Sequence, residues 1–341
     1  MTIRVVIVED SATMRALLMT RLSQEPDIEV VAAAANAQEG RELIRRFDPD
    51  VVTLDIEMPG MNGLDFLDKI MALRPTPVII ISGATQQGAA TTAQALARGA
   101  VACYAKPQGG QPLGADGRLI ELIREAAQVR FARGSVPATG RAVPAANPAV
   151  ALLRPRLVAI GASTGGVEAL HAVLGAYPDD CPPTLVVQHV NARFAPSIAH
   201  SLDAACSARV VLAEPDTLLR PGHIYIAPGD DRHLTVAGTG PFYARLRAGS
   251  AVSGHLPSVD VLFQSVAEKL GSDAVGILLT GMGSDGAQGL LAMYRAGALT
   301  IAQDEASCTV FGMPRAAIAL GAAAVIAPVT GISSRLFRKA A

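Results

Sequence analysis

Short apolar runs alternate with amphipathic stretches along the first third of this 341-residue chain. The runs are nearly continuous in Val, Ile and Leu, as is typical of strands buried on both faces, and the stretches between them have helical spacing. Strands are expected at residues 3–8, 28–33, 51–54, 78–81 and 101–104, and helices after Ser11 and at 38–47, 63–73, 89–98 and 117–131. Regular alternation predicts a parallel sheet with helices on both faces.

The same alternation returns in the second half of the chain. Strands are expected at residues 157–160, 184–187, 209–212, 221–229, 274–279 and 299–302, a hairpin at 234–236 and 242–246, and helices at 167–174, 194–206, 258–270, 287–296 and after Pro314. Between the halves, residues 132–154 are rich in Pro, Gly and Ala without a period, which is typical of a linker. The chain is therefore predicted to be an α/β protein with two doubly wound parallel-sheet domains, residues 1–131 and 155–341, joined by this linker.

Composition excludes several classes of function. The formal net charge is −1, so no overall basic field favours nucleic acid. Apolar runs stay well short of the ~18 residues of a membrane span, and we expect no membrane insertion. The N-terminal residues lead straight into a strand pattern, and the cysteines form no C-x-x-C pair. We therefore expect a cytoplasmic protein with reduced thiols.

Polar side chains gather at the carboxyl ends of the first set of strands. These residues are Glu9, Asp10, Asp55, Ser82 and Lys106. Ligand sites of parallel sheets lie at this edge, and three carboxylates repel one another unless a cation lies among them. Oxygen ligands suit Mg²⁺. A lysine and a hydroxyl opposite them would hold the oxygens of a phosphoryl group on Asp55.

In the second half, the stretch Gly-Ala-Ser-Thr-Gly-Gly at 161–166 joins an expected strand to an expected helix and fits the G-x-S-x-G pattern of a nucleophile elbow. Ser163, His189 and Asp285 all follow expected parallel strands, where a nucleophile, a base and an orienting carboxylate can converge. The backbone N–H of Thr164, together with those of the loop around Asp285, are candidate oxyanion donors.

Three alternatives stay open on these residues. The glycine-rich turn could instead hold a phosphate at a helix N-terminus. His255 competes with His189 as the base, and the order Ser163, Asp216, His255 would follow ordinary α/β-hydrolases. The second half could also be a phospho-regulated binding domain without catalysis.

The first half resembles the receiver domain of response regulators, over residues 3–131. The sequence Asp-Ile-Glu-Met-Pro-Gly-Met-Asn-Gly-Leu at 55–64 carries the resemblance. It implies a flavodoxin-like fold, phosphorylation of Asp55 by a histidine kinase, Mg²⁺ held by Glu9, Asp10 and Asp55, and phosphoryl oxygens contacted by Ser82 and Lys106. The aromatic residue usual three positions before the lysine is replaced by Cys103. The aromatic rotamer switch of the family is therefore not predicted from this sequence.

The second half resembles the chemotaxis methylesterase family, CheB. The motifs are 161–166, Gln188-His189, 225–228, 257–263, 280–286, 303–307 and 312–314. The resemblance implies a Rossmann-like α/β/α esterase domain in which Ser163 is the nucleophile, His189 the base, Asp285 the third member and Met282 part of the oxyanion loop. It implies no cofactor for the esterase step.

The same resemblance implies substrates and control. The substrates would be glutamate γ-methyl esters, and glutamine amides, on chemoreceptor helices, and phosphorylation of the receiver would relieve its restraint on the esterase. Three positions depart from the family pattern: Val167 where proline is frequent, His200 where arginine is frequent and Leu256 where a basic residue is frequent. The last two bear on contacts with an acidic substrate helix, and none alters Ser163, His189 or Asp285.

Overall fold

The computed structural model describes residues 2–58, 63–83, 85–107, 112–114, 117–129 and 155–337, except the side chains of residues 86 and 87. The predicted linker, residues 132–154, lies outside the described residues. The chain folds into two compact units, residues 1–131 and 132–341, each with its own main sheet.

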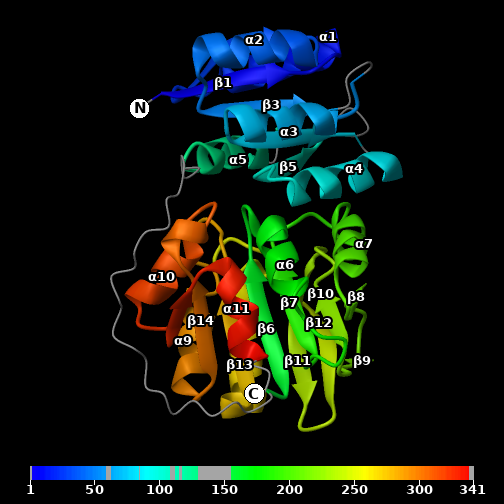
Figure 1. Cartoon of the computed structure of the whole chain (residues 1–341), viewed down its shortest axis with the longest axis vertical. Coiled ribbons are helices and arrows are strands. Elements are labelled where there is room, and N and C mark those ends of the chain that lie inside the picture. Colours follow the sequence, from blue (N-terminus) through cyan, green and yellow to red (C-terminus); the bar gives the residue numbers. More distant parts are fainter. Residues whose placement is uncertain are drawn as a thin grey trace. The chain divides into compact units, whose positions relative to one another are not determined.

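The first unit is built on a five-stranded parallel sheet with the order β2-β1-β3-β4-β5 (Figure 1). This is the flavodoxin-like order, in which ligands lie at the carboxyl ends of β1 and β3 where the order reverses. The strands are β1 (Ile3–Val8), β2 (Ile28–Ala34), β3 (Val51–Asp55), β4 (Val78–Ser82) and β5 (Ala102–Ala105). Both β3 and β4 are buried along their whole length, as their largely apolar sequences predict.

Three helices of the first unit, α1, α2 and α4, begin at polar N-cap residues. Ser11 Oγ accepts the Met14 N–H at the start of α1, and Asn36 Oδ1 accepts the Glu39 N–H at the start of α2. The helices are α1 (Ala12–Leu22), α2 (Ala37–Phe47), α3 (Gly63–Leu73), α4 (Gln86–Ala97) and α5 (Arg118–Ala126). The helix predicted at residues 117–131 was too long, because α5 ends at Ala126 and a turn follows.

The second unit is built on a seven-stranded parallel sheet with the order β15-β14-β13-β6-β7-β10-β8. The chain starts in the middle at β6, builds outward in one direction and returns to build outward in the other, so β6 and β13 meet where the direction changes. The strands are β6 (Leu157–Ala162), β7 (Thr184–Gln188), β8 (Arg209–Leu212), β10 (His223–Ile226), β13 (Ala274–Leu278), β14 (Leu299–Gln303) and β15 (Val325–Ala327). Both units are therefore doubly wound α/β folds, as predicted.

Helices of the second unit pack in two groups. α6 (Gly166–Leu174) contacts α7 (Ala195–Ala205) and α11 (Val329–Leu336), and Ser333 Oγ on α11 donates to Val173 O on α6 at 2.6 Å. α9 (Ala287–Arg295) contacts α8 (Val259–Leu270) and α10 (Met313–Ala319). Figure 1 shows α6 and α11 side by side along the sheet. The apolar face of α8 joins the main core through Val259, Leu262, Phe263 and Val266.

A small antiparallel sheet, in the order β11-β12-β9, lies beside α8. Its strands are β11 (Arg232–Gly238), β12 (Phe242–Ala248) and β9 (Thr217–Leu218), and short 3₁₀ turns lie at Gly271–Asp273 and Glu305–Ser307. The hairpin was predicted; β9, β15 and α11 were not. The two strands are only two and three residues long, and α11 has Gly331 in its first turn, so their patterns are weak.

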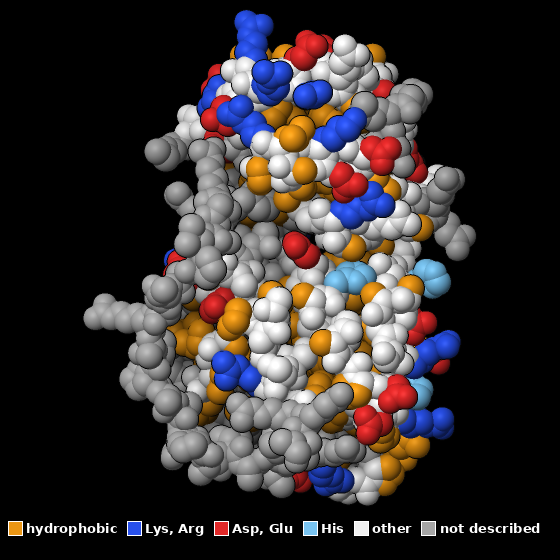
Figure 2. Space-filling model, viewed as in Figure 1, with side chains coloured by type: hydrophobic (Ala, Val, Ile, Leu, Met, Phe, Trp, Pro, Cys, Tyr) orange, Lys and Arg blue, Asp and Glu red, His pale blue; other side chains and the backbone are white. Residues whose placement is uncertain are grey.

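The described surface carries both signs of charge. On the face shown in Figure 2, basic and acidic side chains are interspersed on each unit rather than gathered into one basic patch. Among the helices of the described ranges, none has both the length and the apolar character needed to cross a bilayer.

Candidate functional site

The structure brings four of the five predicted polar residues of the first unit into one cluster. Lys106 Nζ lies 2.6 Å from Asp55 Oδ2 and 3.0 Å from Glu9 Oε2. Ligand oxygens of Glu9, Asp10 and Asp55 all lie within 4.8 Å of one another. Glu9 and Asp55 are buried, whereas Asp10 is exposed. Glu9 and Asp55 thus share one lysine, and Asp10 adds a third carboxylate to the cluster.

The excess of carboxylates over basic groups affects the ionisation of the cluster. Burial, and then the charge of Asp55, raise the pKa of Glu9 to about 7, although Lys106 acts in the opposite direction. Glu9 Oε2 is buried and has no aligned hydrogen bond within the described ranges. Burial alone would lower the pKa of Lys106, but its contacts with Asp55 and Glu9 raise it, so the lysine stays charged. An excess of oxygen ligands, one of them buried without a hydrogen bond, fits a divalent cation such as Mg²⁺.

Ser82 ends β4, the neighbour of β3, and is fully buried. Its Oγ donates only weakly, to the adjacent Gly83 carbonyl at 3.4 Å. On β5, burial raises the pKa of the Cys103 thiol to about 12, so this residue is a neutral thiol. The neighbouring Tyr104 is buried, and its hydroxyl accepts the Gly114 N–H at 3.0 Å.

The predicted nucleophile elbow is a tight turn from β6 into α6. Ser163 follows the last residue of β6; its N–H donates to Thr280 O, and its carbonyl accepts the Gly166 N–H at 2.7 Å. Gly165 has a φ of 74° and caps α6, and a Cβ there would lie 2.4 Å from Thr309. The turn therefore needs glycine both for its backbone and for its packing.

Strand pairing places Ser163 beside His189. Ala162 of β6 is in register with Gln188 of β7, and the His189 N–H donates to Ala162 O at 3.0 Å. Ser163 and His189 are therefore the next residues on two hydrogen-bonded strands. Both lie at the carboxyl edge of the sheet, as predicted from the sequence.

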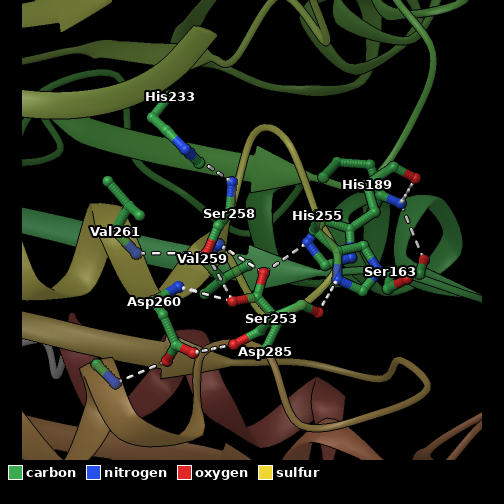
Figure 3. A network of polar contacts seen from close by, with 12 residues as sticks. Ser163, His189, His233, Ser253, His255, Ser258, Val259, Asp260, Val261 and Asp285 are labelled. Atoms are coloured by element: carbon green, nitrogen blue, oxygen red, sulfur yellow. Dashed lines mark hydrogen bonds and ion pairs between the residues drawn. The ribbon is translucent and has the colours of Figure 1, made fainter. Parts of the chain in front are cut away.

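Asp285 reaches the same place from the loop after β13. His189 Nε2 lies 2.8 Å from Asp285 Oδ2, and the two side chains are 5% and 0% exposed (Figure 3). Because a carboxylate only accepts, Nε2 carries a proton, and in the neutral imidazole Nδ1 has the lone pair. Nδ1 is buried and has no hydrogen-bond partner among the described residues, so its bond with Ser163 Oγ is not formed here. Such contacts often form only when substrate is bound.

Asp285 is held by the N-terminus of α8. Its Oδ1 accepts the Ser258 hydroxyl at 2.7 Å and the Asp260 N–H at 3.0 Å, and its Oδ2 accepts the Val259 N–H at 2.7 Å. Burial alone would raise the pKa of Asp285, but His189 and these donors lower it to about 2. The carboxylate is therefore charged throughout the neutral range.

Sequence patterns assigned no role to these donors. Ser258 carried the only available signal, because a serine before an apolar helical pattern is a typical N-cap, and it does accept the Val261 N–H. That the same helix end would face Asp285 depends on tertiary packing. Asp260 adds a further layer: its Oδ1 accepts the Gly289 N–H and its Oδ2 the Ser253 hydroxyl.

The alternative base, His255, lies against His189 rather than replacing it. The two rings are stacked at 3.8 Å between centroids and 7° between planes, and His255 Nδ1 donates to Ser253 O. Nitrogen atoms of His189 and His255 and an oxygen of Asp285 lie within 4.8 Å of one another, but the nitrogen lone pairs of stacked rings lie in two nearly parallel planes and do not converge on one point. This geometry is poor for a shared metal ion. The alternative acid, Asp216, is exposed and pairs with Arg245.

The candidate oxyanion donors lie on two adjoining segments. Thr164 is buried in the turn after Ser163, and its carbonyl accepts the Thr280 hydroxyl at 3.0 Å. Met282 follows Gly281, whose N–H donates to Val310 O; the Met282 N–H has no protein acceptor among the described residues. A Cβ on Gly281 would lie 2.7 Å from Ser163 Cβ, so this loop passes directly over the serine.

The fold and these sites define a class of protein: a receiver-like α/β unit followed by an α/β unit with the site plan of a serine hydrolase. Comparison with known families agrees. Residues 5–115 match the response regulator receiver domain, and residues 158–336 match the CheB methylesterase family. The chain belongs to the CheB methylesterase family.

Named relatives support this assignment over nearly the whole chain. A Caulobacter vibrioides protein named protein-glutamate methylesterase/protein-glutamine glutaminase 1 is 51% identical, with 94% of this chain and 93% of that protein covered. A Rhizobium johnstonii protein of the same name is 49% identical, with coverages of 99% and 96%. The crystal structure of the Thermotoga maritima CheB methylesterase catalytic domain is similar, with a TM-score of 0.52 and 35% identity over 53% of this chain and 97% of that one.

Proposed function

We propose that this protein is a phosphorylation-activated serine esterase that hydrolyses glutamate γ-methyl esters on chemoreceptors and deamidates receptor glutamines. Family membership supports the methylesterase and glutaminase activities. The observation that carries the mechanism is the buried His189–Asp285 pair beside the serine turn, with an Nδ1 lone pair that no described residue occupies. We expect the protein to act in the cytoplasm, where a chemosensory histidine kinase supplies the phosphoryl group.

In the proposed reaction, Ser163 Oγ attacks the ester carbonyl carbon while its proton passes to His189 Nδ1. Asp285, charged and aligned on Nε2, stabilises the imidazolium. The imidazolium then gives its proton to the departing methoxide, and methanol leaves. Water, deprotonated by His189, releases the glutamate carboxylate and restores the serine. With a glutamine substrate the leaving group is ammonia.

The oxyanion of each tetrahedral intermediate would lie among backbone N–H groups. Met282 supplies an N–H without an acceptor in the described part of the chain, and Thr164 lies at the start of the turn into α6, whose dipole favours negative charge. Removing a serine, histidine or aspartate from such a unit lowers the rate by at least about 10³-fold.

Methanol release from methylated receptor tests the esterase. Ser163→Ala should lose at least about 10³-fold in rate. His189→Asn should lose as much, whereas His255→Asn should retain most of the activity because its ring supports His189 and does not take the proton. Full activity in Ser163→Ala would remove the serine mechanism, and selective loss in His255→Asn would transfer the base role to His255.

In the receiver, we propose that Asp55 accepts the phosphoryl group, with Glu9, Asp10 and Asp55 holding Mg²⁺ and with Ser82 and Lys106 contacting the phosphoryl oxygens. The bound cation would neutralise charge on the transferred group. Lys106 is already aligned on Asp55, and the charged ammonium would pass from the carboxylate to the new phosphoryl oxygens. The new charge activates the esterase only if it favours the active arrangement of the two units.

Beryllofluoride with Mg²⁺ tests this regulation. The mixture should raise the methanol-release rate of the full chain and leave Asp55→Asn unchanged. A fragment that begins at Arg154 should be active without any phosphoryl analogue. A fragment no faster than the untreated full chain would contradict restraint by the receiver.

A further inference from the structure

Gln188 links the two residues that the mechanism uses first. It is the last residue of β7 and is 4% exposed. Its side-chain Nε2 lies 2.9 Å from Ser163 O and 3.3 Å from His189 O, and it donates to both carbonyls. One amide group therefore joins the backbone of the nucleophile to the backbone of the base.

The two carbonyls also fix which way this amide faces. Both are acceptors, so the NH₂ end must face them and Oε1 must face away. Oε1 is buried and has no hydrogen-bond partner among the residues that the structure describes. Burying an unpaired amide oxygen destabilises a fold, so an apolar side chain of similar length would remove this penalty. Stability of the fold alone therefore does not explain a glutamine here.

The turn leaves space for this amide. A Cβ on Gly166 would lie 2.2 Å from Gln188 Oε1 and 2.8 Å from Ala162 Cβ. Gly166 is the first residue of α6, and its N–H donates to the same Ser163 carbonyl. Gly166, the third glycine of the 161–166 motif, thus makes room for the side chain that holds the serine peptide.

We propose that Gln188 is a positioning residue that sets the approach of Ser163 Oγ to His189 Nδ1. The proposal rests on the proposed roles of Ser163 and His189. In the described structure Nδ1 has no partner, so the hydroxyl must still form that bond when substrate arrives. Two donors on the Ser163 carbonyl, Gly166 N–H and Gln188 Nε2, hold the serine peptide while its side chain turns. Losing one of them should misplace Oγ and lower kcat.

The test compares Gln188→Met, which keeps the length and removes the donors, with Gln188→Glu and Gly166→Ala in the full chain. Methanol release gives kcat and KM, and an organophosphonate fluoride gives the rate of covalent labelling at Ser163. A misplacement of about 1 Å costs up to about 100-fold, so Gln188→Met should lower kcat and labelling about 30-fold and change KM less than about twofold. Gly166→Ala should follow, because its Cβ displaces the amide.

Gln188→Glu adds a readout that a merely structural role would not move. An ionised carboxylate cannot donate to the two carbonyls, but a protonated one donates once. The ratio of its rate to that of Gln188→Met should therefore rise as pH falls. Ser333→Ala is the matched control, because it removes one buried hydrogen bond of the same unit, at the opposite end of α6 from Ser163, and should lower the melting temperature without lowering kcat.

Three results would overturn the proposal. The first is a kcat of Gln188→Met within about twofold of the wild type, and the second is an equal loss of kcat in Ser333→Ala. The third is a ratio of the Gln188→Glu rate to the Gln188→Met rate that does not change with pH. Its failure is distinguishable from failure of the serine mechanism. An active Ser163→Ala variant removes the mechanism itself, whereas an inactive Ser163→Ala with a fully active Gln188→Met removes the role of Gln188 alone.

Discussion

Each unit of this chain buries a carboxylate at the carboxyl edge of a parallel sheet, yet the pKa values of the two carboxylates are shifted in opposite directions. Asp285 has four hydrogen-bond donors within 3.0 Å, from His189 and the start of α8, and its pKa falls to about 2. Glu9 shares Lys106 with Asp55, and its pKa rises to about 7. Burial alone would raise both pKa values. The number of hydrogen-bond donors around each carboxylate decides whether its pKa ends above or below the usual value.

This contrast fits the different work proposed for the two sites. Asp285 must hold and stabilise one imidazole at every turnover, so the protein satisfies its oxygens completely. The Glu9 cluster is incomplete within the protein, and an incoming cation and phosphoryl group would complete it. The comparison can be tested by changing the hydrogen bonds of Asp285 and by removing the charge of Glu9.

The largest effect should come from Asp285→Asn. An amide would present N–H hydrogens either to His189 or to the donors on α8, so the tautomer of His189 is lost together with the charge. Methanol release should fall at least about 10³-fold. The unfolding free energy of the second unit should fall by roughly 3 kcal/mol, because one partner of a buried charged pair is lost. Steady-state kinetics and denaturant unfolding measure the two effects.

Asp260→Asn is the control for this variant. Asp260 Oδ1 accepts the Gly289 N–H and Oδ2 the Ser253 hydroxyl, and the side chain has no hydrogen bond to His189. We expect Asp260→Asn to lower the stability of the second unit and to lower the methanol-release rate less than about tenfold. Equal inactivation by both substitutions would mean that loop structure, rather than the charge on Asp285, sustains catalysis.

A smaller effect should appear in the receiver without Mg²⁺. Because folding raises the pKa of Glu9 from 4.5 to about 7, the folded state favours the protonated carboxyl. The unfolding free energy of the first unit should therefore fall as pH rises from about 4.5 to about 7 and then level off, by about 2 kcal/mol after allowance for solvent screening. Millimolar Mg²⁺ should restore most of this loss at pH 8, as followed by calorimetry.

Glu9→Gln sharpens the same measurement. Without the titrating carboxyl of Glu9, the unfolding free energy of the first unit should no longer fall between about pH 4.5 and about pH 7. Mg²⁺ should also stabilise this unit much less. Glu29→Gln, which changes an exposed carboxylate on β2, should behave as the wild type. A Glu9→Gln unit that kept the full response to Mg²⁺ would show that Glu9 is not a ligand.

The sequence predicted most of the fold because alternating apolar runs and amphipathic stretches specify a parallel α/β sheet almost by themselves. It missed β15 and α11 because three residues, or a helix with Gly331 in its first turn, carry too little periodicity. Ser163, His189 and Asp285 could be proposed together because strand ends converge on one edge of a parallel sheet. The family resemblance extended this to their expected roles.

What the sequence could not supply is the set of contacts that decides how those residues behave. Ser258 reads as a helix cap, but its hydroxyl also donates to a carboxylate 27 positions away in the chain. Gln188 reads as the end of an apolar strand, but its amide holds two catalytic-edge carbonyls. The pKa values of Glu9 and Asp285 follow from donor counts, which only packing determines.

The smallest predicted effect isolates one donor. Ser258→Ala removes the 2.7 Å hydrogen bond to Asp285 Oδ1 and leaves the backbone donors of Val259 and Asp260 in place. We expect the pKa of Asp285 to rise from about 2, the methanol-release rate to fall about tenfold and stability to fall by about 1–2 kcal/mol. A carboxylate with a depressed pKa stabilises the fold until pH falls through that pKa. The acid-unfolding midpoint of the second unit should therefore move to higher pH.

Ser265→Ala supplies the matched control on the same helix. Its hydroxyl donates to Leu262 O and accepts the Val236 N–H, so the substitution removes comparable hydrogen bonds without touching Asp285. It should cost similar stability at neutral pH, with unchanged kcat. If both serine variants lost activity equally, the donors on Asp285 would matter only through the stability of α8. A loss confined to Ser258→Ala would instead show that each donor contributes to the charge that His189 requires.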